Sequence, residues 1–196
     1  VVDVMIQGEK EEKKIVRLHT GDPCLYGAIR EQMDRLEEEG ISYEVCPGVS
    51  SFCGAAASLQ AEYTLPGISQ TVIITRMEGR TPVPESEKLR SLAAHQSTMV
   101  LFLSTGLLVQ VREELLAGGL APDTPCAICY KATWEDEKIV RGVLDELPEL
   151  AERAGIRKTA LIVVGKVLES EYELSRLYAA EFTTEFRQGR KDEGQK

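Results

Sequence analysis

The sequence has few of the side chains that most often carry catalysis or bind metal ions. Its 196 residues include two histidines, His19 and His95, and one tryptophan, Trp134. Neither histidine has a histidine or cysteine partner at the spacing of a metal site, so a catalytic or metal-bound histidine is the weaker interpretation. The sequence also has no glycine-rich dinucleotide fingerprint and no phosphate-binding loop. These absences exclude the commonest metal and nucleotide sites.

Cysteine is present, but in a pattern that does not indicate disulfides or zinc. The five cysteines are odd in number and scattered through apolar stretches, which indicates free thiols in a reducing compartment. Cys126 and Cys129 have the spacing of half a zinc site, yet they lie in the strand-like segment of residues 125–130. Residues three apart on a strand point to opposite faces, so we predict that both pack in the core and bind no metal.

Long apolar runs and a net positive charge are also missing. No run approaches the roughly 18 to 20 residues of a membrane span, and no signal peptide is visible, so a cytoplasmic location without a membrane partner is expected. The formal charge of −9 and the pI near 4.9 argue against a broad surface for nucleic acid. Apolar residues at 43% and charged residues at 28% are typical of a globular protein with a substantial core.

Short apolar segments alternate with helical patterns, which predicts an α/β fold with a parallel sheet and crossover helices. The predicted strands are residues 15–20, 43–46, 71–75, 98–103, 125–130, 138–144 (an edge strand) and 159–164. The predicted helices are the end of one within residues 1–14, one carrying Leu25, Ile29, Met33 and Leu36, and residues 52–60, 85–95, 106–117 and 145–154. For the second helix we predict Asp22 as the N-cap, Pro23 as the first residue and Gly40 as a left-handed cap.

Residues 76–84 interrupt this pattern with two prolines, a glycine and two arginines, as a linker between domains does. We therefore expect an N-terminal α/β domain in residues 1–75 and a C-terminal α/β domain in residues 85–168. A charged tail at 169–196 follows, with a short helix around residues 174–180. The chain opens with valine inside a helical pattern, which suggests that N-terminal sequence is missing.

Two loops that follow predicted strands are the best candidates for a binding site, because ligands of α/β sheets bind beyond the carboxyl ends of strands. In the first, Gly21 permits a sharp turn and Asp22 offers a carboxylate. In the second, Ser50 and Ser51 place hydroxyls and N–H groups at a helix start. Ordinary strand-to-helix turn chemistry explains each loop alone equally well.

Taken together, four separated blocks resemble the tetrapyrrole methylase family. They are Thr20-Gly-Asp-Pro-x-x-Tyr-Gly, Pro47-Gly-Val-Ser-Ser51, residues 75–85, and Tyr130-Lys-Ala-Thr-Trp134 with residues 136–141. The last two are similar to the branch that methylates C-11 of precorrin-4, or of its cobalt form, in cobalamin biosynthesis. The N-terminal strand and glycine-rich loop of the family pattern are absent here, so the N-terminal domain is expected to be incomplete.

The resemblance implies two α/β domains with S-adenosylmethionine in the cleft between them, a tetrapyrrole substrate and a homodimer. Carried over by position, the cofactor-binding residues are Thr20, Gly21, Asp22, Leu25, Ser50, Ser51, Leu103, Ala132, Thr133, Ala160 and Leu161. Asp22 is also the candidate for aiding proton loss or orienting a ring nitrogen, although helix capping explains it at least as well.

Arg76 and Arg80 are candidate substrate-binding residues, because a tetrapyrrole with many carboxylate arms needs bidentate partners. The alternative, that both arginines clamp the linker to the domains, explains them equally well. Two other functions stay open. One is a methyltransferase of the same fold acting on a different ring carbon or substrate, although the acidic balance weighs against RNA. The other is an inactive truncated module for binding or dimerisation.

Overall fold

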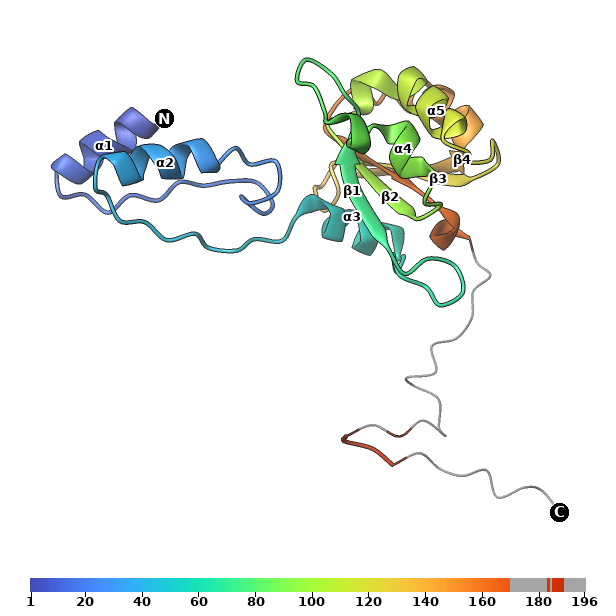
Figure 1. The fold of residues 1–196 in the computed structure, drawn as a ribbon, viewed down its shortest axis with the longest axis horizontal. Helices are drawn as coiled ribbons and strands as arrows, with labels where there is room; N and C mark the ends of the chain where they lie inside the picture. The colour runs from blue at the N-terminus through green and yellow to red at the C-terminus, as the bar shows by residue number, and fades with distance from the viewer. Residues whose placement is uncertain (170–182, 184, 189–196) are drawn as a thin grey trace. The chain divides into compact units, whose positions relative to one another are not determined.

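The structure is a computed structural model that describes residues 1–169, 183 and 185–188 (Figure 1). The chain divides into two compact units, Val1–Ala55 and Ala56–Lys196.

The first unit contains two packed helices, α1 (Val2–Lys10) and α2 (Arg30–Glu38), and the start of α3 (Ser51–Leu59). Ile6 of α1 and Leu36 of α2 are buried, and Arg35 donates to the carboxylate of Asp3 at 2.9 Å. Gly40 follows α2 with φ of +69°, and the Ile41 N–H donates to the Leu36 carbonyl at 2.9 Å. This geometry confirms the predicted left-handed cap.

Two predictions for the first unit are wrong. Residues 15–20 and 43–46 are not strands, because within the described residues neither segment pairs with another, and an extended segment needs a ladder partner to be stable. Leu18 is accordingly 78% exposed. The helix expected directly after Asp22 begins only at Arg30, so Asp22 is not its N-cap. The Asp22 carboxylate instead closes a local turn by accepting the N–H of Cys24 at 2.8 Å.

The second unit is built on a five-stranded mixed sheet (Figure 1). Its strands are β1 (Val72–Arg76), β2 (Thr98–Phe102), β3 (Pro125–Tyr130), β4 (Lys138–Val143) and β5 (Ala160–Val164). Their order is β1-β2-β5-β3-β4, so β4 is an edge strand as predicted.

The expectation of a parallel sheet is wrong for this unit. Only β1 and β2 are parallel, whereas β5 is antiparallel to β2 and β3, and β4 is antiparallel to β3. The short connection of residues 131–137 explains the last pair, because antiparallel neighbours can be joined by a short loop, whereas a parallel crossover needs about a dozen residues or more.

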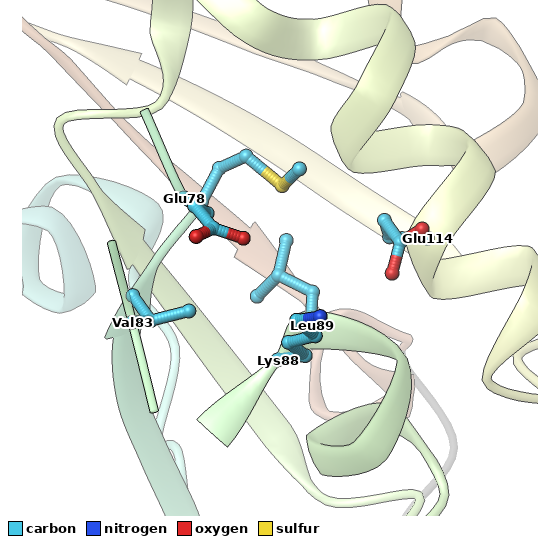
Figure 2. Close-up of a pocket in the computed structure, with 6 residues that line it drawn as sticks. Glu78, Val83, Lys88, Leu89 and Glu114 are labelled. Carbon is cyan, nitrogen blue, oxygen red and sulfur yellow. The ribbon is translucent and has the colours of Figure 1, made fainter. Parts of the chain in front are cut away.

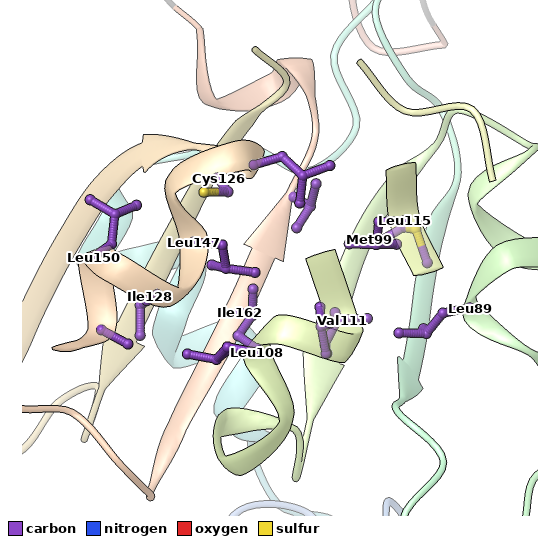
Figure 3. Close-up of a cluster of buried hydrophobic side chains, with 14 of the residues drawn as sticks. Leu89, Met99, Leu108, Val111, Leu115, Cys126, Ile128, Leu147, Leu150 and Ile162 are labelled. Carbon is purple, nitrogen blue, oxygen red and sulfur yellow. The ribbon is translucent and has the colours of Figure 1, made fainter. Parts of the chain in front are cut away.

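Helices cover one face of the sheet and complete the core (Figures 1 and 3). They are α4 (Leu89–Ala93), α5 (Leu108–Ala117) and α6 (Leu147–Ala154), with 3-10 turns at Glu85–Glu87, Thr105–Leu107, Leu144–Glu146 and Lys166–Leu168. Alternate strand residues such as Met99 and Leu101 point into this cluster, as do Ile128 and Ile162. All four are fully buried.

The predicted domain boundary differs from this arrangement. Because β1 pairs with β2, residues 72–76 belong to the sheet of the second unit, and the loop of residues 77–84 lies within that unit. The units divide instead at Ala55 and Ala56. The helix predicted around residues 174–180 lies outside the described residues.

The cysteines of β3 are buried, as predicted. Cys126 belongs to the core cluster beneath the helices and Cys129 does not, consistent with opposite faces of the strand. Burial raises the pKa of each thiol to about 12, which disfavours the thiolate that metal binding requires. Across residues 1–169, 183 and 185–188, no three His, Cys, Asp or Glu side chains gather as metal ligands. None of the helices in this described part has the length and apolar character of a membrane span.

The packing of the core predicts that two valines of α5 contribute differently to the free energy of unfolding. Val111 is fully buried and Val109 is 46% exposed on the same helix, so the helix-propensity change of a Val→Ala substitution cancels in the comparison. We expect Val111→Ala to lower the free energy of unfolding by about 1.5–3 kcal/mol and Val109→Ala by less than about 0.5 kcal/mol. Denaturant unfolding of both variants measures this difference, and equal costs would contradict the packing described.

Candidate functional site

The two candidate loops of the first unit lie in contact. The carboxylate of Asp22 accepts the N–H of Gly48 at 2.9 Å through Oδ2, while Oδ1 accepts the N–H of Cys24. The hydrogen bond from the Gly48 N–H, and to a smaller extent that from the Cys24 N–H, holds the pKa of Asp22 below its ordinary value of 3.8. Asp22 is therefore a carboxylate that fastens one loop to the other.

Glycine occupies two positions of this contact, Gly48 because of the close approach and Gly21 because of its backbone conformation. A Cβ on Gly48 would lie 2.2 Å from the carbonyl oxygen of Gly21, far inside van der Waals contact. Gly21 itself has φ of +70°, and a Cβ there would lie 3.5 Å from the Ser50 Cα and the Ser51 N. Gly48 is not among the residues predicted for the site from the sequence.

The other predicted residues of this unit surround the same contact. Ser50 is buried at the entrance to α3, and Ser51 is the exposed first residue of that helix. Leu25 is half-buried and Thr20 is exposed. The structure thus brings together all the residues predicted from the two loops.

In the second unit, the sheet register brings the remaining candidates to one edge. Tyr130 pairs with Ala160 at the end of β3 and the start of β5, and Leu101 near the end of β2 pairs with Ile162. The turn after β3, the residue after β2 and the start of β5 therefore meet. The residues of this unit that were carried over by position from the family resemblance all belong to this edge, which we call the strand-end edge: Leu103, Ala132, Thr133, Ala160 and Leu161.

Of the nine non-glycine residues with positive φ in the described part of the chain, four lie at the strand-end edge. Four non-glycine residues there have left-handed φ: Leu103 at +52°, Lys131 at +46°, Thr133 at +73° and Thr159 at +58°. Such conformations cost on the order of 1–3 kcal/mol each and tend to cluster where a site has to be shaped. Lys131 and Thr159 were not predicted as site residues, and their types give no sequence signal for this conformation.

Leu103 is the most unusual of these residues. It is 73% exposed although it follows the fully buried strand β2. The next residue, Ser104, is fully buried; its hydroxyl accepts the Met77 N–H at 2.8 Å and donates to the Phe102 carbonyl at 2.6 Å. Thr105 then donates to the carbonyl of Ala160 at 3.0 Å. These bonds fix the chain on either side of Leu103 and leave its side chain outward.

The two arginines of the predicted linker have different surroundings. The guanidinium of Arg76 donates to the carbonyls of Met77, Thr81 and Pro82 at 3.3, 3.0 and 2.9 Å, so it clamps the loop that follows β1. Arg80, at the tip of that loop, is exposed. The clamp interpretation therefore fits Arg76 and leaves Arg80 accessible to a ligand.

Beside this loop the structure has a small open cavity of about 150 Å³ (Figure 2). Met77, Glu78, Val83, Lys88, Leu89 and Glu114 line it. Two of its charged groups are already paired, Lys88 with Glu85 at 2.6 Å and Glu114 with Arg90 at 2.8 Å. None of the predicted site residues lines this cavity, so it is not the site assembled above.

The strand-end edge fits a nucleoside cofactor better than a metal ion. It offers an exposed apolar side chain at Leu103 and small side chains at Ala132 and Ala160, with backbone groups of tight turns around them. Apolar surface with a few placed polar groups is what small-molecule sites typically provide. The residues therefore fit S-adenosylmethionine, whose adenosine moiety needs such contacts.

The second unit is thus a mixed α/β unit with a candidate site for a nucleoside cofactor, and the comparisons with known proteins identify its family. The chain belongs to the tetrapyrrole (corrin/porphyrin) methylases, whose family profile matches residues 1–148. It is 54% identical over 192 residues to the cobalt-precorrin-4 C(11)-methyltransferase of Methanocaldococcus jannaschii; the match covers 97% of this chain and 74% of that protein. The resemblance predicted from the four blocks is confirmed.

Solved structures confirm the predicted fold class. The X-ray structure of a cobalt-precorrin-4 methyltransferase superposes with a TM-score of 0.84 at 50% identity, covering 86% of this chain and 70% of the other. Uroporphyrin-III C-methyltransferase of Thermus thermophilus, crystallised with S-adenosylhomocysteine, gives 0.72 at 26% identity, covering 85% and 72%. The fold is therefore the mixed α/β fold of tetrapyrrole methylases.

The contact between the two loops predicts that residue 48 must be glycine. Gly48→Ala forces its Cβ against the backbone of Gly21, which cannot rotate away, so the loops separate and the bond to Asp22 is lost. We expect the amides of residues 24 and 48 to exchange with solvent about tenfold faster or more. The control is Gly106→Ala, where nothing lies within 4 Å of the new Cβ. Unchanged exchange at both amides would contradict the described contact.

Proposed function

We propose that this protein transfers a methyl group from S-adenosylmethionine to C-11 of precorrin-4, or of cobalt-precorrin-4, in cobalamin biosynthesis. The observation that carries the proposal is the 54% identity over 97% of the chain to a protein named for this reaction. The strand-end edge and the two loops of the first unit supply residues suited to it.

The chemistry agrees with a site that has few titratable groups. When bound, the cofactor supplies a methyl group on a positively charged sulfur. The sulfur would leave as a neutral thioether once the substrate ring carbon takes the methyl group, so the departing sulfur would need no proton from the protein. Because the leaving group is already activated, the task of the protein is to hold donor and acceptor in line at about 3 Å. Rigid turns and apolar contacts perform that task.

We propose two groups of cofactor-binding residues, one in each unit. In the first unit they are the contacting loops, with Thr20, Gly21, Asp22, Leu25, Ser50 and Ser51. In the second they are Leu103, Ala132, Thr133, Ala160 and Leu161 at the strand-end edge. For Asp22 we favour fastening the loops over proton transfer, because each of its carboxylate oxygens already accepts a backbone N–H.

We propose Arg80 as a substrate-binding residue and Arg76 as the residue that shapes its loop. The protein carries a formal charge of −9, which would repel a polycarboxylate unless a local cation offset it. Arg80 is exposed at the loop tip, whereas Arg76 is occupied by three backbone carbonyls. We further propose a cytoplasmic homodimer, the location expected from the sequence and the assembly that the family resemblance implies.

A labelled-methyl assay tests the function. The protein is incubated with S-adenosylmethionine carrying a ¹³C methyl group and with precorrin-4, in parallel with and without cobalt in the ring. We expect a ¹³C signal from a methyl group at C-11 of one of the two substrates. Methylation at another ring carbon would favour the alternative tetrapyrrole methyltransferase. Ligand binding without any transfer would favour the non-catalytic module.

The role of Arg80 gives a separate prediction. Arg80→Ala removes one exposed cation, and a charged hydrogen bond is worth about 1.5–3 kcal/mol, so we expect tetrapyrrole binding to weaken about tenfold or more. Affinity for S-adenosylhomocysteine and the melting temperature should stay nearly unchanged. Arg153→Ala, on the exposed end of α6, controls for the loss of one positive charge. A lower melting temperature with both affinities intact would make Arg80 a structural residue.

A further inference from the structure

The turn between β3 and β4, residues 131–137, contains a carboxylate whose contacts the proposed chemistry does not use. Oε2 of Glu137 accepts the hydroxyl of Ser58 at 2.6 Å and the backbone N–H of Thr133 at 2.5 Å. Ser58 lies in α3, 79 residues away in sequence. One oxygen therefore joins a helix to the strained centre of the turn.

The backbone of Thr133 requires such a partner. Thr133 has φ of +73°, and a β-branched residue in this region is an outlier that persists only when its surroundings hold it there. The Trp134 N–H donates to the Lys131 carbonyl at 3.0 Å and the Glu137 N–H to the Trp134 carbonyl at 3.1 Å, which closes the turn around this residue. The Glu137 carboxylate is the acceptor for the Thr133 N–H itself.

The rest of the turn is held by the second carboxylate, Asp136. The ammonium of Lys131 lies 2.5 Å from the Asp136 carboxylate and 5.2 Å from the ring centroids of both Tyr130 and Trp134. Asp136 thus forms its ion pair within the turn, whereas Glu137 forms a hydrogen bond outside the turn, to α3. The pKa of Glu137 is lowered most by the hydrogen bond from Ser58 and next by that from the Thr133 N–H. The carboxylate that accepts both bonds is therefore kept ionised.

From this geometry we infer that Glu137 is a positioning residue for cofactor binding, acting through Thr133 and anchored to α3 by Ser58. The inference rests on the proposed function, because Thr133 is one of the proposed cofactor residues. Since the Thr133 N–H is directed at Glu137, the cofactor contact at this residue has to use its carbonyl or hydroxyl group. Through the Thr133 N–H, Glu137 holds the peptide plane between Ala132 and Thr133, and with it the direction of the Ala132 carbonyl.

The test compares four variants with the unaltered protein, three at Glu137 and Glu135 and one at Ser58. Glu137→Ala removes the anchor, and we expect the Kd for S-adenosylhomocysteine and the KM for S-adenosylmethionine to rise about tenfold or more, with the tetrapyrrole KM changing less than about threefold. Glu137→Gln should restore affinity to within about threefold, because a single oxygen accepts both bonds and the glutamine carbonyl can replace it. Glu135→Ala, an exposed residue of the same turn, is the matched control and should change nothing.

Ser58→Ala keeps the test decisive if Glu137→Ala does not fold, since it removes only one of the two bonds; we expect about a threefold rise in the Kd for S-adenosylhomocysteine. A fall in melting temperature for Glu137→Ala with unchanged Kd and KM would make its role structural and overturn the inference alone. Failure of the unaltered protein to bind S-adenosylhomocysteine would overturn the proposed function, and this role with it.

Discussion

The position of β5 between β2 and β3 is the constraint on which the candidate site of the second unit depends. Because β5 is antiparallel to both neighbours, its first residues lie where the other two strands end. Backbone pairing alone brings three distant parts of the sequence to one edge, namely Leu103, the turn after Tyr130, and Ala160. Core packing under α4, α5 and α6 then keeps that pairing fixed.

This arrangement also accounts for the strain at the edge. The chain leaves β2 and β3, and enters β5, through left-handed residues whose side chains do not favour that conformation. Two of them support each other, since the Lys131 N–H donates to the Thr159 carbonyl at 3.0 Å. Ser104 and Glu137 hold the flanking turns. Hydrogen bonds to Met77 and Ser58, both distant in sequence, thus anchor these turns to the rest of the unit.

Local pattern was sufficient to predict part of the fold. Residues 125–130 were predicted as a strand with the observed limits, and the strand alternation of Cys126 and Cys129 was read correctly because period two is a local property. Residues 15–20 looked equally strand-like, but a strand also needs a paired neighbour, which local pattern does not reveal. The antiparallel pairing of β5 was missed for the same reason.

The candidate site was predicted mainly through motif resemblance, and the contacts within it were not. Nothing in the sequence shows that Arg76 would be occupied by three carbonyls while Arg80 stays exposed, since both sit in the same broken segment. Glu137 was also missed, because its partner Ser58 is brought to it only by the tertiary fold. The family motifs thus supplied the candidate segments, and the geometry distinguishes the contacts of the residues within them.

We propose the strand-end edge as the surface that binds the cofactor. Amide chemical-shift mapping on the isotope-labelled protein, titrated with S-adenosylhomocysteine, locates the bound ligand. We expect saturable shifts at Leu103, at Ala132 and Thr133, and at Ala160 and Leu161, with the same Kd at every site. Saturable binding that shifts none of these amides, with changes confined to the cavity lined by Met77 and Glu114, would contradict it.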